Sequence, residues 1–228
     1  MPALADVDLV LLDVNETLSD TAPLADALAD AGAPRSLAAT WFSGVLRDGF
    51  ALTVAGAAAP FARVAEGGLR SLLAGLEVDD ADAVVEAGMS ALRSSPPHPD
   101  VAPGLRALAA SGLRLATLSN GGPQVADDLL RRAGVRDVVE RLLSVEDGPA
   151  GAWKPAASAY RHALGSCDVA PGRALLVAVH PWDVDGAARA GLRTAWLDRA
   201  RTRAFPTHLT PADLVASSLV DLATQLRR

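Results

Sequence analysis

The sequence has little cysteine, no long apolar run and no long basic run, and each absence excludes a class of protein. Cys167 is the only cysteine among 228 residues, which excludes a disulfide framework within one chain. No apolar stretch reaches the ~18 residues that a membrane-spanning helix needs. The net charge is −6, so neither nucleic acid nor an anionic membrane is expected as a partner.

The first ten residues also lack a basic segment followed by an apolar one, the pattern typical of a signal peptide. We therefore expect a cytoplasmic protein. Half of the residues are apolar, so a chain of this length can bury a substantial core. It suits one domain, or a core with a smaller companion.

Five short apolar runs are typical of buried parallel strands, and the last four each follow a helix-like stretch. In the stretch 103–112, for example, Leu105 and Leu108 fall on one helix face and Gly112 ends the helix. This alternation predicts an α/β fold, a Rossmann-like parallel sheet with helices on both faces. The five runs are residues 7–13, 113–120, 138–146, 174–180 and 192–198, and a last short strand and amphipathic helix are expected near the C-terminus.

The segment 20–97 has a different pattern, because helix-like runs follow one another there with no convincing strand between them. It closes with the proline-rich sequence SSPPHPD, which is typical of a linker. We therefore expect a helical cap domain over residues 20–97, inserted into a Rossmann-like core made of residues 1–19 and 98–228.

Polar side chains stand where the predicted strands end. Ligands of open parallel sheets bind at the carboxyl ends of the strands, so these side chains are candidates for one site. They combine a carboxylate, a hydroxyl and amide pair, an ammonium group and a second carboxylate. The candidates are Asp13 and Thr17, Ser119 and Asn120, Lys154, and His180 with Trp182 and Asp183.

Several of these residues have a purely structural alternative. Asp13 could cap the following turn, and Ser119 and Asn120 could be turn residues before Gly121. Lys154 could be a solvated residue at a helix start, and Asp183 could bond to the backbone of the helix that it opens. Trp182 could pack against its neighbours or form a wall of the substrate site.

Four segments, taken in order, resemble the motifs of the haloacid dehalogenase superfamily. They span the predicted core, and the cap insertion falls where that family places one. Their details resemble the type II 2-haloacid dehalogenases more than the phosphatases of the superfamily. The segments are DVNETL (13–18), TLSNGG (117–122), WKPAASAY (153–160) and HPWDVDGAARAG (180–191).

The resemblance implies covalent catalysis. Asp13 would attack the substrate carbon, displace the leaving group and form an aspartyl ester that water then hydrolyses. Lys154 would keep Asp13 ionised, and Asp183 would position or deprotonate the water. Thr17, Ser119 and Asn120 would orient the nucleophile or bind a substrate carboxylate. Tyr160, the only tyrosine, matches a family tyrosine that either packs or contacts the site.

Two positions depart from the pattern of the phosphatases. Those enzymes need an acid two residues after the nucleophile, where this chain has Asn15. They also need an acidic residue for Mg²⁺ four residues before Asp183, where this chain has Val179. We therefore expect no metal and no other cofactor.

Three positions also depart from the type II dehalogenases. Asn15 replaces an aromatic residue, and Phe42 stands where those enzymes place the arginine that receives the halide. His180 replaces an asparagine. It could hold the halide or the water, act as a base, or only form a hydrogen bond at the strand end. We expect Asn15, Phe42 and His180 in the pocket wall.

The leading hypothesis is a metal-independent hydrolase that acts on a carbon–halide bond of a small 2-halocarboxylic acid. The alternatives are a phosphatase of the same superfamily acting on a small phosphate ester, and a non-catalytic metabolite-binding relative. The expected partner is a small-molecule substrate, and the resemblance suggests a homodimer. The natural substrate, its handedness and the motion of the cap do not follow from the sequence.

Overall fold

The computed structural model describes residues 6–148, 151–201 and 204–226. Within these ranges six strands form one parallel sheet in the order β3-β2-β1-β4-β5-β6. The strands are β1 (Leu9–Leu12), β2 (Arg114–Ser119), β3 (Arg141–Ser144), β4 (Ala174–Ala178), β5 (Arg193–Leu197) and β6 (Leu214–Ala216). The α/β fold class predicted from the sequence is confirmed.

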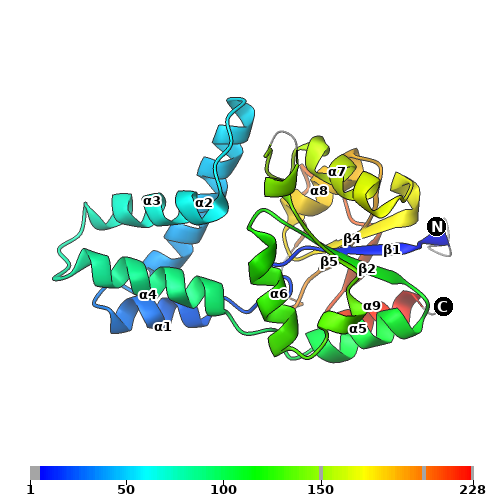
Figure 1. Ribbon diagram of the computed structural model, residues 1–228, viewed down its shortest axis with the longest axis horizontal. Coiled ribbons are helices and arrows are strands. Elements are labelled where there is room, and N and C mark those ends of the chain that lie inside the picture. Colours follow the sequence, from blue (N-terminus) through cyan, green and yellow to red (C-terminus); the bar gives the residue numbers. More distant parts are fainter. Residues whose placement is uncertain (1–5, 149–150, 202–203, 227–228) are drawn as a thin grey trace.

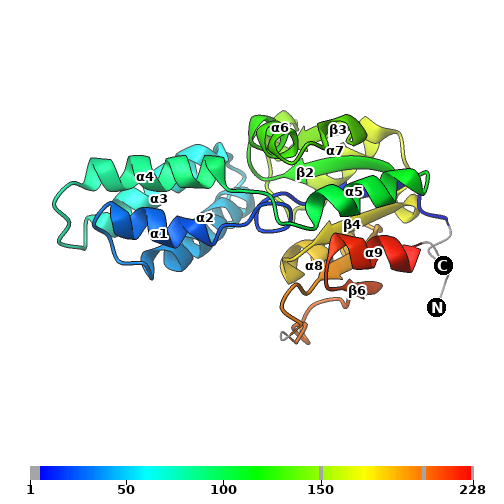
Figure 2. The ribbon, with the colours of Figure 1, turned by 90° about the horizontal axis from the view of Figure 1, so that it is seen from below.

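Helices cover both faces of the sheet (Figures 1 and 2). Val10 and Leu12 pack with α5, α6 and α9, whereas Leu9 and Leu11 pack with α7 and α8 on the opposite face. Side chains alternate between the two faces of a strand, and β1 is apolar throughout because both of its faces are covered. These helices are α5 (Val101–Ala110), α6 (Pro123–Arg132), α7 (Ala157–Cys167), α8 (Pro181–Arg189) and α9 (Leu219–Leu226).

The four helices between β1 and α5 form a separate bundle beside the sheet (Figure 1). In α3 the buried residues recur every four positions, so one face of the helix packs against its neighbours. Ser19 and Pro97 form an antiparallel bridge where the chain enters and leaves this bundle. The exact boundaries at residues 19/20 and 97/98 stay a prediction. The helices are α1 (Pro23–Asp30), α2 (Leu37–Val54), α3 (Phe61–Leu73) and α4 (Ala81–Ser94).

The third predicted strand is shorter than its apolar run. Residues 138–146 were expected to be extended, but β3 covers only Arg141–Ser144. Short 3₁₀ turns lie on both sides, over Arg136–Val138 and Val145–Asp147. The second turn begins because the Ser144 hydroxyl accepts from the Glu146 N–H while the Asp147 carboxylate accepts from the Ser144 N–H.

Trp153, which lies in the loop before α7, joins the bundle to the core. Its backbone N–H donates to the Thr53 hydroxyl and its indole N–H donates to the Ala59 carbonyl. Its ring stacks on Phe61 at a centroid distance of 5.4 Å. A Cβ at Gly49 of α2 would lie 2.1 Å from this ring, so glycine is required there for the two parts to approach so closely.

Candidate active site

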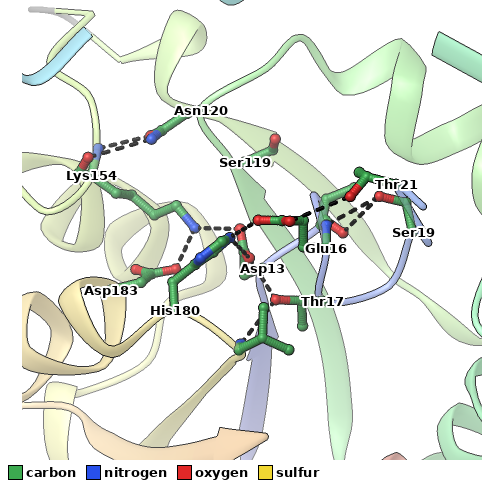
Figure 3. A network of polar contacts seen from close by, with 12 residues as sticks. Asp13, Glu16, Thr17, Ser19, Thr21, Ser119, Asn120, Lys154, His180 and Asp183 are labelled. Atoms are coloured by element: carbon green, nitrogen blue, oxygen red, sulfur yellow. Dashed lines mark hydrogen bonds and ion pairs between the residues drawn. The ribbon is translucent and has the colours of Figure 1, made fainter. Parts of the chain in front are cut away.

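Asp13 follows β1, and its carboxylate is bonded through both oxygens (Figure 3). Oδ1 accepts from Lys154 Nζ at 2.8 Å, and Oδ2 accepts from the Thr17 hydroxyl at 2.6 Å. The Thr17 oxygen in turn accepts from the Val179 N–H at 3.1 Å. Since β1 lies between β2 and β4, Asp13 stands in the middle of the edge formed by the carboxyl ends of the strands.

Lys154 connects the two carboxylates of the site. Its ammonium donates to Asp13 and, at 2.6 Å, to Asp183 Oδ2, and its side chain is fully buried. Asn120 fixes the Lys154 backbone, because its amide oxygen accepts from the Lys154 N–H and its amide nitrogen donates to the Lys154 carbonyl. The Asn120 side chain therefore positions the lysine, and full burial excludes the alternative of a solvated lysine.

Asp183 lies in the first turn of α8 and has no exposed surface. Its second oxygen, Oδ1, accepts from the Tyr160 hydroxyl at 2.6 Å. Tyr160 is fully buried, so its hydroxyl orients Asp183 rather than facing a substrate. A Cβ at Gly186 would lie 2.7 Å from this hydroxyl, and glycine at that position lets α8 approach the tyrosine.

The charges of the site keep Asp13 ionised. Burial by itself raises the pKa of Asp13, but the charge of Lys154 and the hydrogen bonds from Lys154 and Thr17 hold the pKa below its usual value. Burial also opposes the charge of Lys154, yet the two carboxylates raise its pKa. The pKa of Asp183 is raised, first by burial and then by the charge of Asp13. At neutral pH the site therefore contains an aspartate anion beside a lysine cation.

A small apolar cavity of about 190 Å³ lies next to the strand ends, at the junction of the core and the helical bundle. This is the volume of about six water molecules. Of the residues expected in the site, Asn15 and Ser119 line it. The other lining residues are Pro60, Phe61, Ala62, Met89, Leu92, Arg93, Gly121, Gly122, Gln124, Val125 and Glu146.

Phe42 and Trp182 lie away from this cavity lining. Phe42 is buried behind Phe61, with the two ring centroids 6.5 Å apart. Trp182 stacks on the His180 ring at 5.0 Å and meets the ring of Phe50 from α2 edge-on. Both rings pack against aromatic neighbours in this structure, and their contact with a substrate stays a prediction.

His180 lies close to both Asp13 and Glu16 (Figure 3). Its Nε2 lies 3.9 Å from Asp13 Oδ2 and 3.4 Å from Glu16 Oε2. Glu16 was not among the residues predicted for the site. It lies inside the first motif, but one sequence gives no signal that separates it from a solvated turn residue.

The cap residues of the cavity were also missed. Phe61 and Arg93 come from α3 and α4, and Glu146 follows β3 and accepts from the Phe61 N–H at 3.0 Å. Amphipathic cap helices give no sign of which residues turn toward the core. Within residues 6–148, 151–201 and 204–226, no cluster of His, Cys, Asp and Glu is arranged to hold a metal ion, and no helix could span a membrane.

Comparison with known proteins agrees with this geometry. The profile of the haloacid dehalogenase-like hydrolases matches residues 7–191. Haloacetate dehalogenase H-2 of Moraxella sp. (strain B) is 38% identical over 103 residues, 45% of this chain and 45% of that protein. The chain thus matches under half the length of this relative. A phosphoserine phosphatase of Thermus thermophilus is 35% identical over 117 residues, 51% of this chain and 46% of that protein.

The likeness to solved structures extends over nearly the whole chain. The L-2-haloacid dehalogenase of Xanthobacter autotrophicus, solved with chloropropionic acid covalently bound, superposes with a TM-score of 0.85 and 27% identity. The superposition covers 97% of this chain and 98% of that one. With four motifs in order and a profile match over most of its length, the chain belongs to the haloacid dehalogenase-like hydrolases.

Proposed function

We propose that this protein is a metal-independent hydrolase that displaces halide from a small 2-halocarboxylic acid through an ester on Asp13. The bonding of Asp13 carries the proposal. Its carboxylate is ionised by Lys154 and oriented by Thr17, and it stands among the residues that a nucleophile needs. The relatives named as haloacetate and 2-haloacid dehalogenases support the same reaction.

The cavity supports a small and partly apolar substrate. Phe61, Met89 and Leu92 form its apolar wall, which suits the alkyl part of the acid. Ser119 and the backbone after β2 lie at its other side, where α6 begins. The N-terminus of a helix favours an anion, so we place the substrate carboxylate against Ser119 and Gly121.

The reaction would proceed in two steps. An Asp13 oxygen attacks the carbon that bears the halogen, the carbon–halogen bond breaks and halide leaves with the bonding electrons. Water then attacks the carbonyl carbon of the Asp13 ester, and the hydroxy acid leaves with the original Asp13 oxygen. Lys154 balances the carboxylate charge before and after these steps, and Asp183 with Tyr160 holds Lys154 in place.

The first prediction concerns this activity. Purified protein should release halide from chloroacetate, bromoacetate, fluoroacetate or 2-chloropropionate, unchanged by EDTA, and Asp13→Asn should abolish the release because the amide is not a nucleophile. After several turnovers in H₂¹⁸O, mass spectrometry should find the label in the Asp13 carboxylate. A folded protein that releases no halide from any of these acids would contradict the substrate class.

The alternative reaction, phosphate transfer, is separable in the same assays. Mg²⁺-dependent release of phosphate from a small aryl or sugar phosphate would support a phosphatase, against the chemistry of Asn15 and Val179. Unlabelled Asp13 beside labelled product would contradict the covalent route. The homodimer and the cytoplasmic location stay predictions, and light scattering during size-exclusion chromatography tests the first.

A further inference from the structure

Hydrolysis of an Asp13 ester requires a group that removes a proton from water, and the bonding of Asp183 makes it unsuited to that task. Both Asp183 oxygens already accept hydrogen bonds, one from Lys154 and one from Tyr160. The side chain has no exposed surface. Water therefore has no access to Asp183 in this arrangement, although the sequence pattern suggests that role.

His180 meets the requirement. Its Nε2 lies 3.9 Å from Asp13 Oδ2, too far for a direct hydrogen bond and suited to a water molecule that touches both groups. About an eighth of the His180 side chain is exposed, at 13%, so water can reach it. The stacked Trp182 ring fixes the plane of the imidazole.

The Glu16 carboxylate lies beside the same imidazole nitrogen as Asp13. Its Oε2 lies 3.4 Å from His180 Nε2, and its Oε1 accepts from the Thr21 hydroxyl (Figure 3). Glu16 has a positive φ of 61°, a strained conformation for a residue with a side chain. Hydrogen bonds from its N–H to Ser19 and from His98 to its carbonyl maintain that conformation.

Glu16 and His180 also line a second, open hollow of about 330 Å³, called the polar hollow below, which shares no lining residue with the apolar cavity. Asp20, His98 and Arg199 are the other charged or titratable groups around it. The Arg199 guanidinium is bonded to Asp100 and to the Thr17 carbonyl. The imidazole thus stands between the nucleophile and a region that is open to solvent.

We propose that His180 is the general base of the hydrolytic step, that the Glu16 carboxylate beside its Nε2 stabilises the imidazolium and takes up the proton, and that the polar hollow conducts this proton to solvent. This inference rests on the proposed function. His180 takes one proton from water as the oxygen bonds to the Asp13 carbonyl carbon. The bond from that carbon to the substrate oxygen then breaks, and the departing alkoxide takes one proton. Water supplies two protons and the hydroxy acid keeps one, so one proton leaves through His180.

The test separates formation of the ester from its hydrolysis. In rapid-quench experiments with chloroacetate or 2-chloropropionate, His180→Asn should still release about one halide per active site in a burst. Its steady-state rate of halide release after the burst should fall about 100-fold or more, the range that a general base contributes. Intact-protein mass spectrometry should find the ester accumulated on Asp13 in the variant and not in the wild-type protein.

Two further variants exclude a merely structural effect. His180→Gly should regain hydrolysis when imidazole is added, because the hollow admits a small base to the vacated position. Glu16→Gln should slow hydrolysis of the ester, and combining it with His180→Asn should slow hydrolysis no further than His180→Asn alone. The exposed His208 provides the matched control, since His208→Asn should leave both steps unchanged.

Two outcomes overturn the inference, and they are distinguishable. If wild-type protein releases no halide from any haloacid, the proposed function is wrong and the role of His180 in it falls too. If wild-type protein releases halide but His180→Asn hydrolyses its ester at the wild-type rate, or gives no burst while folded, the assignment of His180 is wrong and the dehalogenase reaction stands.

Discussion

At the scale of single residues, the site depends on the only lysine and the only tyrosine of the chain. Lys154 is surrounded by carboxylates, whereas the surface carries its positive charge on arginines. A compact ammonium group can donate to two carboxylates at once within a small buried space. Tyr160 then satisfies the remaining oxygen of Asp183. A buried carboxylate pair is stable only when such partners are present.

The second prediction concerns the charge of Lys154. In Lys154→Met no positive charge would offset the burial of Asp13. The pKa of Asp13 should therefore rise, so that less Asp13 is ionised at a given pH. Activity needs the ionised form, and the pH–activity profile should therefore move to higher pH. Each unit of the shift lowers activity about tenfold on the acidic side. The measurement is halide release from pH 5 to pH 9.

Arg161→Met is the matched control for this prediction, because it removes a positive charge from the exposed face of α7. Its profile should coincide with that of the wild-type protein. Urea unfolding of both variants verifies that they are folded. A folded Lys154→Met protein with an unshifted profile would contradict the role of Lys154 in ionising Asp13.

At the scale of elements, α8 shows how one short helix supports both the site and the fold. Asp183 and Gly186 face inward, toward Lys154 and Tyr160. Asp185 accepts from Arg189 one turn later and from the N–H of Thr210 in the following loop. The hydrogen bond from Arg189 lowers the pKa of Asp185 most, and with the Thr210 bonds it brings the pKa to about 2.

The third prediction follows from this lowered pKa. A group whose pKa is lower in the folded state stabilises the fold above its unfolded pKa, near 3.8, and loses that effect as pH falls toward 2. Asp185→Asn should therefore lower the free energy of unfolding by at most about 2.5 kcal/mol at pH 7. The difference between variant and wild type should shrink between pH 4 and pH 2.

Urea unfolding at pH 7 and at pH 3 measures this effect. Asp79→Asn, in an exposed part of the helical bundle, is the control and should leave the free energy of unfolding unchanged at both pH values. Asparagine can still accept from the Thr210 N–H, so the comparison isolates the charge of Asp185. A loss of stability that is equal at both pH values would contradict an electrostatic origin.

At the scale of the whole molecule, the helical bundle and the core meet where the apolar cavity lies. Phe61 of α3 lines the cavity and stacks on Trp153 of the core, and its N–H donates to Glu146. The position of the cap therefore determines the shape of the cavity. The large side chain of Trp153 is fully buried at this junction, and so is the side chain of the adjacent Lys154.

The fourth prediction concerns this junction. Trp153→Ala should remove the stack on Phe61 and the indole bond to Ala59 and lower the free energy of unfolding by about 3–5 kcal/mol. Trp153→Phe, which keeps a ring against Phe61 and loses only the bond to Ala59, should cost about 1 kcal/mol. Urea unfolding measures both, and limited proteolysis in α2 should be faster in the alanine variant. If the alanine variant were as stable as the wild type, Trp153 would not stabilise the contact between the helical bundle and the core.

The sequence by itself determined the fold class, the five main strands, the cap helices and the residues at the strand ends. Strand and helix periodicity is a local property, and a carboxylate after a buried strand is brought to the same edge in any parallel sheet. Asp13, Lys154 and Asp183 could therefore be named together. Membership of the haloacid dehalogenase-like hydrolases was confirmed on the same motifs.

Only the tertiary structure decided what each polar group bonds to and which side chains reach the cavity. Asn120 turned out to hold the Lys154 backbone, Tyr160 to orient Asp183, and Phe42 to lie behind Phe61. These relations join segments far apart in the chain, and no local pattern encodes them. Glu16 became a candidate only because the fold brings His180 within 3.4 Å of it, 164 positions away in sequence.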